Sequence, residues 1–343
     1  MDLERDLNKT MEMINSDSTY RFDRVYPFAT ENVGACLSSY DFKDKDCLTV
    51  LGSGVQALYM FMKGAKSVCA FDVNSLSIYY YEFLKAFIRS GLDFSSYRKL
   101  FIKSFGNKDN TYKQILDCMD GDYRNYFKVL YDKYGSSILS NRKLFNTVAI
   151  SKYACAKYND IFRKENLEVL RSKINDLDFR FINSDINNLV LDRSYDFMYF
   201  SNIMQYVSEM YNDNMINSLS KYRELLLKFK ELLNKGGSMY ASYIYGIDLL
   251  AIPNMDAFCL ASIEHVLEHD LNNYTAFNTL VTNITDKVDN LYITAEGLYV
   301  NNSLNKVEIE VNSSLLTKDK LLMISQLISE EIVKQFNDNL LIK

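Results

Sequence analysis

The amino-acid sequence predicts an α/β protein with a mostly parallel sheet and flanking helices. Short apolar segments of the kind that form buried strands alternate with longer segments of helical apolar spacing over residues 47–245. The clearest alternation lies in residues 47–74, where the sequence reads CLTVLGSGVQALYMFMKGAKSVCAFDVN. Because parallel neighbours need a crossover connection, which is usually a helix, this alternation favours a parallel sheet.

Residues 47–74 also carry candidate nucleotide-binding residues. Cys47–Val50 is short and apolar, as a strand buried on both faces should be. Two glycines then form a tight turn before the predicted helix Val55–Gly64, and the second strand, Ser67–Phe71, ends at an aspartate about 20 residues after them. A helix N-terminus beside a carboxylate that accepts ribose hydroxyls is typical of nucleotide-binding βαβ units. The residues that we expect to bind a nucleotide are Gly52, Ser53, Gly54, Asp72, Val73 and Asn74.

The following segments bear on which nucleotide is bound. The dinucleotide fingerprint G-x-G-x-x-G has Ala57 at its third glycine position, which the fingerprint allows, so the glycines alone leave NAD open. Asp185 follows a third apolar strand in FINSDI, and a fourth strand, Tyr195–Phe200, ends in Ser201-Asn202. A long amphipathic helix then runs to the sequence LLNKGG, and a fifth strand, Met239–Tyr245, follows it.

This ordered series resembles the class I S-adenosylmethionine-dependent transferases along their whole core. The resemblance implies a Rossmann-like class I methyltransferase fold with a seven-stranded sheet and S-adenosylmethionine as the cofactor. It also implies an acidic residue near the adenine and further cofactor contacts at strand ends, at Asp185, Ile186, Ser201 and Asn202. From the residues alone, a turn aspartate at 185 and helix N-caps at 201 and 202 are open alternatives.

A narrower resemblance covers roughly residues 45–240. The segments GSGVQAL, AFDVNSLS, GLDFSSYRKLF, ENLEVLRSKI and YDFMYFSNIMQYV resemble the diacylglycerol 3-amino-3-carboxypropyl transferase family and its uncharacterised bacterial relatives. The chain departs from the family's usual asparagine at Gln56 and proline at Ser75, and Val50 lacks the carboxylate that many methyltransferases have there. The resemblance implies transfer of a methyl or a 3-amino-3-carboxypropyl group to a small-molecule or lipid-like acceptor.

The N-terminal segment, residues 1–46, is expected to form a helical cover that begins with a helix over residues 1–20. Tyr26-Pro27-Phe28 either closes over the ligand or packs as an aromatic part of the cover. If this segment and the segment after the fourth strand face the acceptor, the substrate-binding residues are Tyr206, Tyr26 and Phe28.

Residues 91–146 are a predicted helical insertion that follows a helix over Ser75–Arg89. A crossover needs only about a dozen residues, so the insertion is surplus to the sheet. It is rich in tyrosines, among them Tyr112 and Tyr123, which we expect at the surface. The insertion forms either one wall of an acceptor pocket or a cover for the sheet. A long helix over residues 147–176 should then lead back to the third strand.

The C-terminal part predicts further elements beyond the fifth strand. Asp256–Glu268 has helical spacing, and Leu291–Ala295 with Lys306–Val311 reads as a β-hairpin. In the resembling fold, an antiparallel strand pair of this kind closes the sheet, so the main domain is expected to cover residues 47–315. Lys318–Phe336 is amphipathic and predicts an extra helix within residues 316–343.

Composition and charge exclude some classes of protein. A net charge of −5 and a pI near 5.3 disfavour a nucleic-acid-binding protein, which needs a basic surface. No apolar run approaches the ~20 residues that cross a bilayer, and the charged N-terminus has no signal-peptide core. We therefore expect a cytoplasmic protein without a transmembrane segment. Its six cysteines are widely spaced and lack a C-x-x-C pair, so reduced thiols are expected.

Two other functions are open from the sequence. The histidines of HVLEH, His265 and His269, share a helix face with Glu268 between them, which is the inverted zinc-protease pattern of a metal-dependent hydrolase. A catalytic zinc needs a third protein ligand, and no residue is evident for that role. The third possibility is a catalytically inactive protein that binds the cofactor without turning it over.

Overall fold

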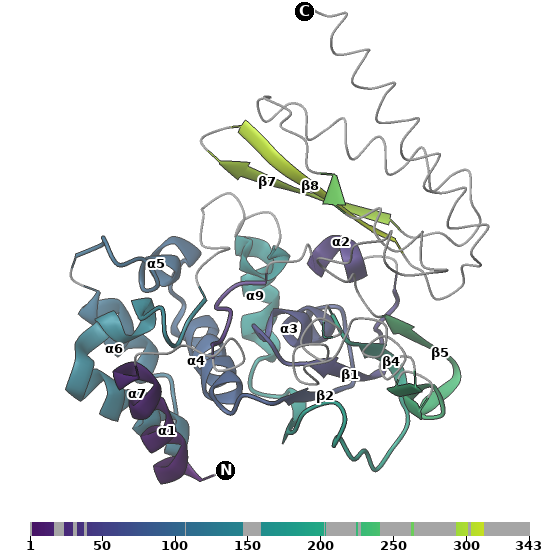
Figure 1. Ribbon diagram of the computed structural model, residues 1–343, viewed down its shortest axis with the longest axis horizontal. Helices are drawn as coiled ribbons and strands as arrows, with labels where there is room; N and C mark the ends of the chain where they lie inside the picture. Colours follow the sequence, from purple (N-terminus) through teal and green to yellow (C-terminus); the bar gives the residue numbers. More distant parts are fainter. Residues whose placement is uncertain are drawn as a thin grey trace, which may run out of the picture. The chain divides into compact units, whose positions relative to one another are not determined.

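The computed structural model describes residues 2–16, 24–29, 33–37, 40–106, 108–146, 159–201, 203, 224–225, 228–240, 262–263, 293–300 and 303–311 (Figure 1). The chain divides into two units, each of which is described by itself. The first unit comprises Met1–Met198 with Leu232–Ser238, and the second comprises Tyr199–Glu231 with Met239–Lys343.

A sheet of five strands has the order β3-β2-β1-β4-β5. The strands are β1 (Asp46–Val50), β2 (Ser67–Asp72), β3 (Asp178–Asn183), β4 (Tyr195–Tyr199) and β5 (Leu233–Tyr240). β2 pairs in parallel with both β1 and β3. Val50 lies opposite Phe71, and Asp72 lies opposite Asn183, so the carboxyl ends of these three strands are level. The parallel α/β architecture predicted from the alternating segments is confirmed.

The burial of the strands follows their place in the sheet. The central residues of β1 and nearly all of β2 are buried on both faces, as their apolar sequences predict. β3 was expected to be apolar, but it is the edge strand of this sheet, and its charged residues Asp178 and Arg180 are exposed. An edge strand with charged side chains resists pairing with another chain.

Helices α3 (Val55–Met62), α4 (Leu76–Ser90) and α9 (Lys164–Lys173) lie on one face of the sheet, in the connections between the three parallel strands. α3 lies between β1 and β2 in the sequence, and all of its residues are buried. α4 and α9 lie between β2 and β3, and α9 packs against both α3 and α4 (Figure 1). Right-handed crossovers that step in the same direction put their helices on one face, which accounts for these contacts.

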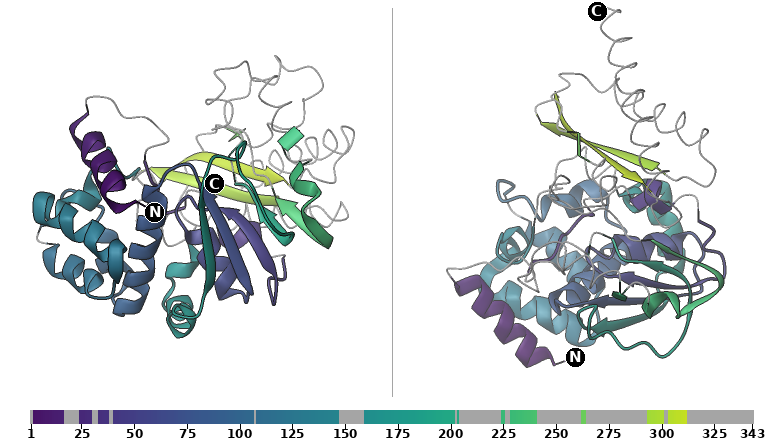
Figure 2. Two further views of the ribbon diagram at one scale, coloured as in Figure 1. Left: turned by 90° about the horizontal axis from the view of Figure 1, so that it is seen from below. Right: turned by 45° about the vertical axis from the view of Figure 1, so that its right-hand side comes forward.

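The insertion packs against α4. It contains α5 (Phe94–Lys99), α6 (Asp109–Leu116), α7 (Gly121–Tyr134) and the 3-10 segment η2 (Gly135–Ser140). α6 and α7 contact α4, and the N-terminal helix α1 (Leu3–Asn15) contacts α7, beside which both views of Figure 2 show it. Tyr79 of α4 stacks on Tyr126 of α7 at 3.9 Å, and Thr10 hydrogen-bonds to the Tyr126 hydroxyl at 2.6 Å. Of the two alternatives for the insertion, these contacts favour a cover, which packs over α4, rather than a wall of an acceptor pocket.

Two connecting segments differ from the sequence prediction. In place of one helix over 147–176, the described part has the 3-10 turn η3 (Asp160–Phe162), an extended Arg163 and then α9. The turn lies where Asn159 exchanges two hydrogen bonds with the main chain of Ala29, at 2.8 and 3.1 Å. This long-range pairing competes with helix formation. Residues 147–158 lie outside the described residues.

The fifth strand begins earlier than predicted. Lys235-Gly236-Gly237 was expected to precede a strand over Met239–Tyr245, but these residues lie inside β5. A Cβ atom at Gly237 would lie 2.9 Å from the Asn234 oxygen and 3.0 Å from the Asp196 oxygen of β4. Glycine is therefore needed at 237 for close main-chain contacts within β5 and with β4, and Gly236 has φ +82°, in the left-handed region that favours glycine.

The predicted hairpin is present in the second unit. β7 (Ile293–Val300) and β8 (Ser303–Val311) pair antiparallel, and β8 also pairs with β6 (Ser262–Ile263). These strands form a sheet of their own in the order β6-β8-β7, so the described residues give five strands in the main sheet rather than seven. β6 falls inside the predicted helix Asp256–Glu268, because pairing with β8 overrides the local helical spacing. The predicted helix Lys318–Phe336 lies outside the described residues.

Candidate functional site

The turn after β1 holds two glycines that do different things. Gly52 has φ +49° and Gly54 has φ +75°, both in the left-handed region that favours glycine. A Cβ atom at Gly52 would meet nothing within 4 Å, whereas one at Gly54 would lie 2.5 Å from Cδ2 of Tyr81. Gly52 therefore borders open space, and Gly54 allows α4 to pack against the turn. Ser53 is buried, and its Oγ accepts from Val55 N at 3.4 Å at the start of α3.

Asp72 ends β2 beside this turn, as predicted. One carboxylate oxygen accepts from Gly52 N at 3.0 Å, and the other accepts from Asn74 N at 2.9 Å. Burial raises the pKa of this half-buried carboxyl group, while hydrogen bonds from Asn74, Ser77 and Gly52 oppose the rise. The carboxylate therefore joins the ends of β1 and β2, whereas the structural alternative open from the sequence was a loop aspartate that caps the helix at Ser75.

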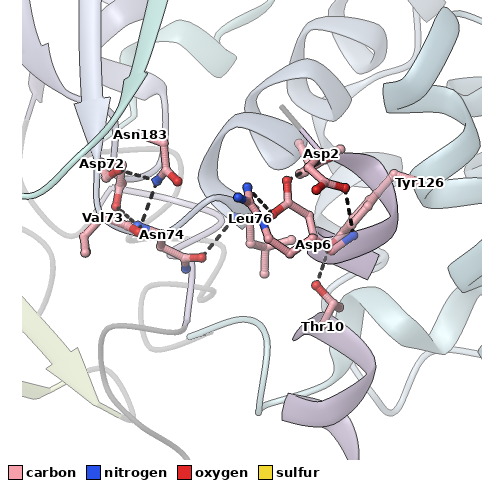
Figure 3. A network of polar contacts seen from close by, with 11 residues as sticks. Asp2, Asp6, Thr10, Asp72, Val73, Asn74, Leu76, Tyr126 and Asn183 are labelled. Carbon is pink, nitrogen blue, oxygen red and sulfur yellow. Dashed lines mark hydrogen bonds and ion pairs between the residues drawn. The ribbon is translucent and has the colours of Figure 1, made fainter. Parts of the chain in front are cut away.

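Val73 and Asn74 differ in exposure. The Val73 side chain is 43% exposed. Asn74 is buried, and its Oδ1 accepts from Leu76 N at 3.0 Å, so it caps the start of α4 (Figure 3). Of these two predicted cofactor contacts, only Val73 presents its side chain to solvent.

The end of β3 is attached to the end of β2 by a side chain that the sequence analysis missed. Asn183 Nδ2 donates to the carbonyl oxygens of Asp72 at 2.8 Å and Val73 at 3.1 Å (Figure 3). Ser184 N also donates to the Asp72 carbonyl oxygen, at 3.0 Å. A polar residue at the last position of a strand is a signal for this edge, but it is common at turns, so it did not single out Asn183.

Asp185 and Ile186 follow directly. The Asp185 carboxylate accepts from Asn187 N at 2.8 Å and from Asn188 N and Nδ2 at 3.2 and 2.7 Å. Partial burial raises the pKa of Asp185, but these hydrogen bonds outweigh burial and bring the pKa below its usual value. Ile186 is buried. This geometry shows the turn role of Asp185, and an additional contact to adenine stays a prediction.

Among the described contacts, none brings the other residues predicted to bind cofactor or substrate to the carboxyl ends of β1, β2 and β3. Phe28 is 1% exposed and lies in an aromatic cluster with ring centroids 5.5–6.1 Å away, at Phe94, Tyr97, Phe101 and Phe162. It therefore packs in the cover rather than lining an open site, while its neighbour Tyr26 is half-buried. Ser201, in the second unit, is buried and has φ +50°, a rare value for a residue other than glycine. Asn202 and Tyr206 lie outside the described residues.

Tyr112 was expected at the surface but is fully buried. Its hydroxyl donates to the Phe127 carbonyl oxygen at 3.0 Å, inside the insertion. Tyr123 is half-buried, and its ring lies 5.8 Å from that of Tyr79. The two tyrosines thus stabilise the packing of the insertion helices.

Other kinds of site find no support in the part of the chain that the structure describes. Within it, no cluster of His, Cys, Asp and Glu side chains could hold a metal ion, and His265, Glu268 and His269 lie outside it. None of the described helices is long and apolar enough to cross a membrane. Cys47 and Cys69 are buried free thiols, and burial raises the pKa of Cys47 to about 12.

Comparisons with known proteins show distant likenesses. No family model matches the chain, and no curated protein matches it. A solved S-adenosylmethionine-dependent methyltransferase from Clostridium acetobutylicum is 8% identical, with 95% of this chain and 86% of that chain covered and a TM-score of 0.28. The glycopeptide N-methyltransferase MtfA is 9% identical, with 89% and 81% covered and a TM-score of 0.29. A precorrin 8w decarboxylase from Methanobacterium thermoautotrophicum is 11% identical, with 81% and 85% covered and a TM-score of 0.28. Likenesses at this level carry no argument about activity, so function is inferred from the residues of this chain.

Proposed function

We propose that this chain is an S-adenosylmethionine-dependent transferase whose cofactor lies against Gly52, Asp72 and Val73. The observation that carries the proposal is the open space at the Cβ position of Gly52, directly beside the carboxylate to which Gly52 N donates. A glycine that borders open space lets a ligand approach the main chain closely. The neighbouring carboxylate can accept hydrogen bonds from ribose hydroxyls, and the exposed Val73 side chain can contact the face of a base.

The second glycine supports S-adenosylmethionine over a dinucleotide. In dinucleotide-binding folds, the second glycine of the fingerprint leaves room for the pyrophosphate. Here the corresponding residue is Gly54, and the Tyr81 ring fills the space at its Cβ position. The fit is therefore better for a nucleoside without a pyrophosphate. The ordered strand-end residues, which resemble those of class I transferases, support the same choice.

The proposed reaction needs little acid–base chemistry from the protein. S-adenosylmethionine supplies an activated carbon and a neutral leaving group, so alignment with the acceptor provides most of the catalysis. The chain's contribution is to hold the nucleoside, through Gly52 and Asp72. The family resemblance supports transfer of either a methyl or a 3-amino-3-carboxypropyl group to a small-molecule or lipid-like acceptor, in the cytoplasm.

The proposal is tested first by binding. Isothermal titration calorimetry with the full chain should show binding of S-adenosylmethionine and S-adenosylhomocysteine, and none of NADH at the same concentrations. Tight NADH binding with no response to either adenosyl compound would refute the proposal.

The group transferred is identified by its by-product. The chain is incubated with S-adenosylmethionine and extract fractions, and the nucleoside released is identified by mass spectrometry. Methylthioadenosine indicates 3-amino-3-carboxypropyl transfer, and S-adenosylhomocysteine indicates methyl transfer. Binding without release of either compound in any fraction supports the inactive cofactor-binding alternative.

A further inference from the structure

We infer that Asn183 is a positioning residue for nucleoside recognition: it holds Asp72 and Val73 where the ribose and the base meet them. This inference rests on the proposed function and names a residue that neither the glycine turn nor the acidic motif includes. Asn183 does not itself contact the proposed ligand. It acts through the main chain of its neighbours on β2.

The hydrogen bonds of Asn183 restrain two consecutive peptide groups. Its Nδ2 donates to the carbonyl oxygens of both Asp72 and Val73, at 2.8 and 3.1 Å. Ser184 N donates to the same Asp72 oxygen, so both lone pairs of that oxygen have donors. The Asp72 carboxylate and the Val73 side chain are attached to these restrained peptide groups, as Figure 3 shows.

The position of Asn183 argues against a mainly structural role. Its side chain is exposed at the end of the edge strand β3, so its hydrogen bonds compete with water. Within the described part of the chain it caps no helix, and β2 and β3 are already joined by their parallel ladder as far as Asp72. The additional bonds act on the last residue of the ladder, Asp72, and on Val73 directly beyond it, and these are the residues that border the proposed site.

Asp72 itself is a poor target for a direct test. Its carboxylate accepts from Gly52 N and Asn74 N, so its replacement would release the glycine turn as well as a ribose contact. Removing the ligand's hydroxyl avoids this problem. The ratio of affinities for S-adenosylhomocysteine and its 2′-deoxy analogue measures how strongly the carboxylate binds the ribose 2′-hydroxyl.

The experiment measures this ratio by calorimetry in the wild-type chain and in variants. Loss of a hydrogen bond to a charged group should weaken wild-type binding of the 2′-deoxy analogue by roughly tenfold to a hundredfold. Alanine has no side-chain donor, and an ionised aspartate only accepts, so neither Asn183→Ala nor Asn183→Asp can donate to the two carbonyl oxygens. In both variants the ratio of affinities should fall at least about threefold. The aspartate variant keeps the shape of asparagine and serves if the alanine variant folds poorly.

Asn234→Ala is the matched control. Asn234 is also exposed and donates through Nδ2, at 3.0 Å to Asp196, but it lies near the amino ends of β4 and β5. This variant should keep the wild-type ratio. An unchanged ratio in both Asn183 variants, an equal fall in Asn234→Ala, or a wild-type ratio of one would overturn the inference. A wild-type chain that binds no S-adenosylhomocysteine would instead overturn the proposed function.

Discussion

Replacement of Gly52 by alanine should weaken binding of S-adenosylhomocysteine, and it should lower stability no more than the same replacement at a similar glycine elsewhere. Gly52 has a close match elsewhere in the first unit: Gly121, the first residue of α7, has φ +52° against +49° for Gly52. An added Cβ atom would meet nothing within 4 Å at either position. Each alanine therefore has only the left-handed backbone penalty, about 1–2 kcal/mol, to overcome.

The two variants should differ only where a ligand is present. At Gly52 the new methyl group would occupy the space beside the Gly52 N–H and the Asp72 carboxylate. Exclusion of the ligand from this space should lower affinity at least about tenfold, which corresponds to roughly 1.4 kcal/mol. At Gly121 the methyl group lies on the insertion, so affinity should stay at the wild-type value.

The assay combines thermal unfolding with calorimetric titration of S-adenosylhomocysteine. Both variants should lose a few degrees in melting temperature, by similar amounts. If Gly52→Ala binds as tightly as the wild-type chain, the ligand does not lie against this turn. If Gly121→Ala loses as much affinity as Gly52→Ala, the effect comes from reduced stability, and the reasoning from open space fails.

Three further predictions concern packing and pH. Gly54→Val should lower the free energy of unfolding by about 2–5 kcal/mol, because its side chain meets the Tyr81 ring and φ is +75°; a melting temperature equal to that of wild type would contradict the packing. Tyr112→Phe removes the side-chain hydrogen bond to the Phe127 carbonyl, which keeps its helical main-chain donor, and should cost about 0.5–1.5 kcal/mol in urea unfolding, with ligand affinity unchanged. Hydrogen bonds to main-chain N–H groups at the start of α5 lower the pKa of Asp93, so its stabilising contribution is complete above about pH 4 and is lost as the pH falls through the lower folded-state pKa. The difference in unfolding free energy between wild type and Asp93→Asn should therefore shrink below about pH 4; a difference independent of pH would show that the carboxylate does not cap the helix.

The elements that the sequence predicted closely are those with strong local signals. β1 and β2 match the predicted Cys47–Val50 and Ser67–Phe71 to within a residue, because continuous apolar runs bounded by polar residues specify buried strands locally. α3 and α4 likewise begin at their predicted residues to within one position. The juxtaposition of Gly52 and Asp72 also followed from spacing, since the parallel pairing of adjacent strands brings their ends together.

Predictions about the environment of single side chains were less successful. Tyr112 was expected at the surface, but it is fully buried and bonded to the Phe127 carbonyl. For Phe28 the sequence left an acceptor contact and packing in the cover open, and the structure shows packing in the cover. Tyr81 of α4 fills the space at the Cβ position of Gly54, which the sequence did not predict, and a cofactor contact at Gly54 stays a prediction. An aromatic residue or a glycine has the same local signature in a core and in a binding site, so the sequence alone could not separate these roles.

The sequence by itself determined the alternation of strands and helices, the glycine turn and the acidic residue at the end of β2, because each depends on neighbours within a few residues. Only the tertiary structure decided which glycine borders open space, that the Asp72 carboxylate holds the turn, and that Asn183 is bonded to the end of β2. The hairpin β7–β8 was predicted locally, but its pairing with β6 was not. The physical reason is the same in each case: these features are contacts between segments separated by 20 or more residues. Such contacts form through packing and hydrogen bonding across the fold, and local spacing does not encode them.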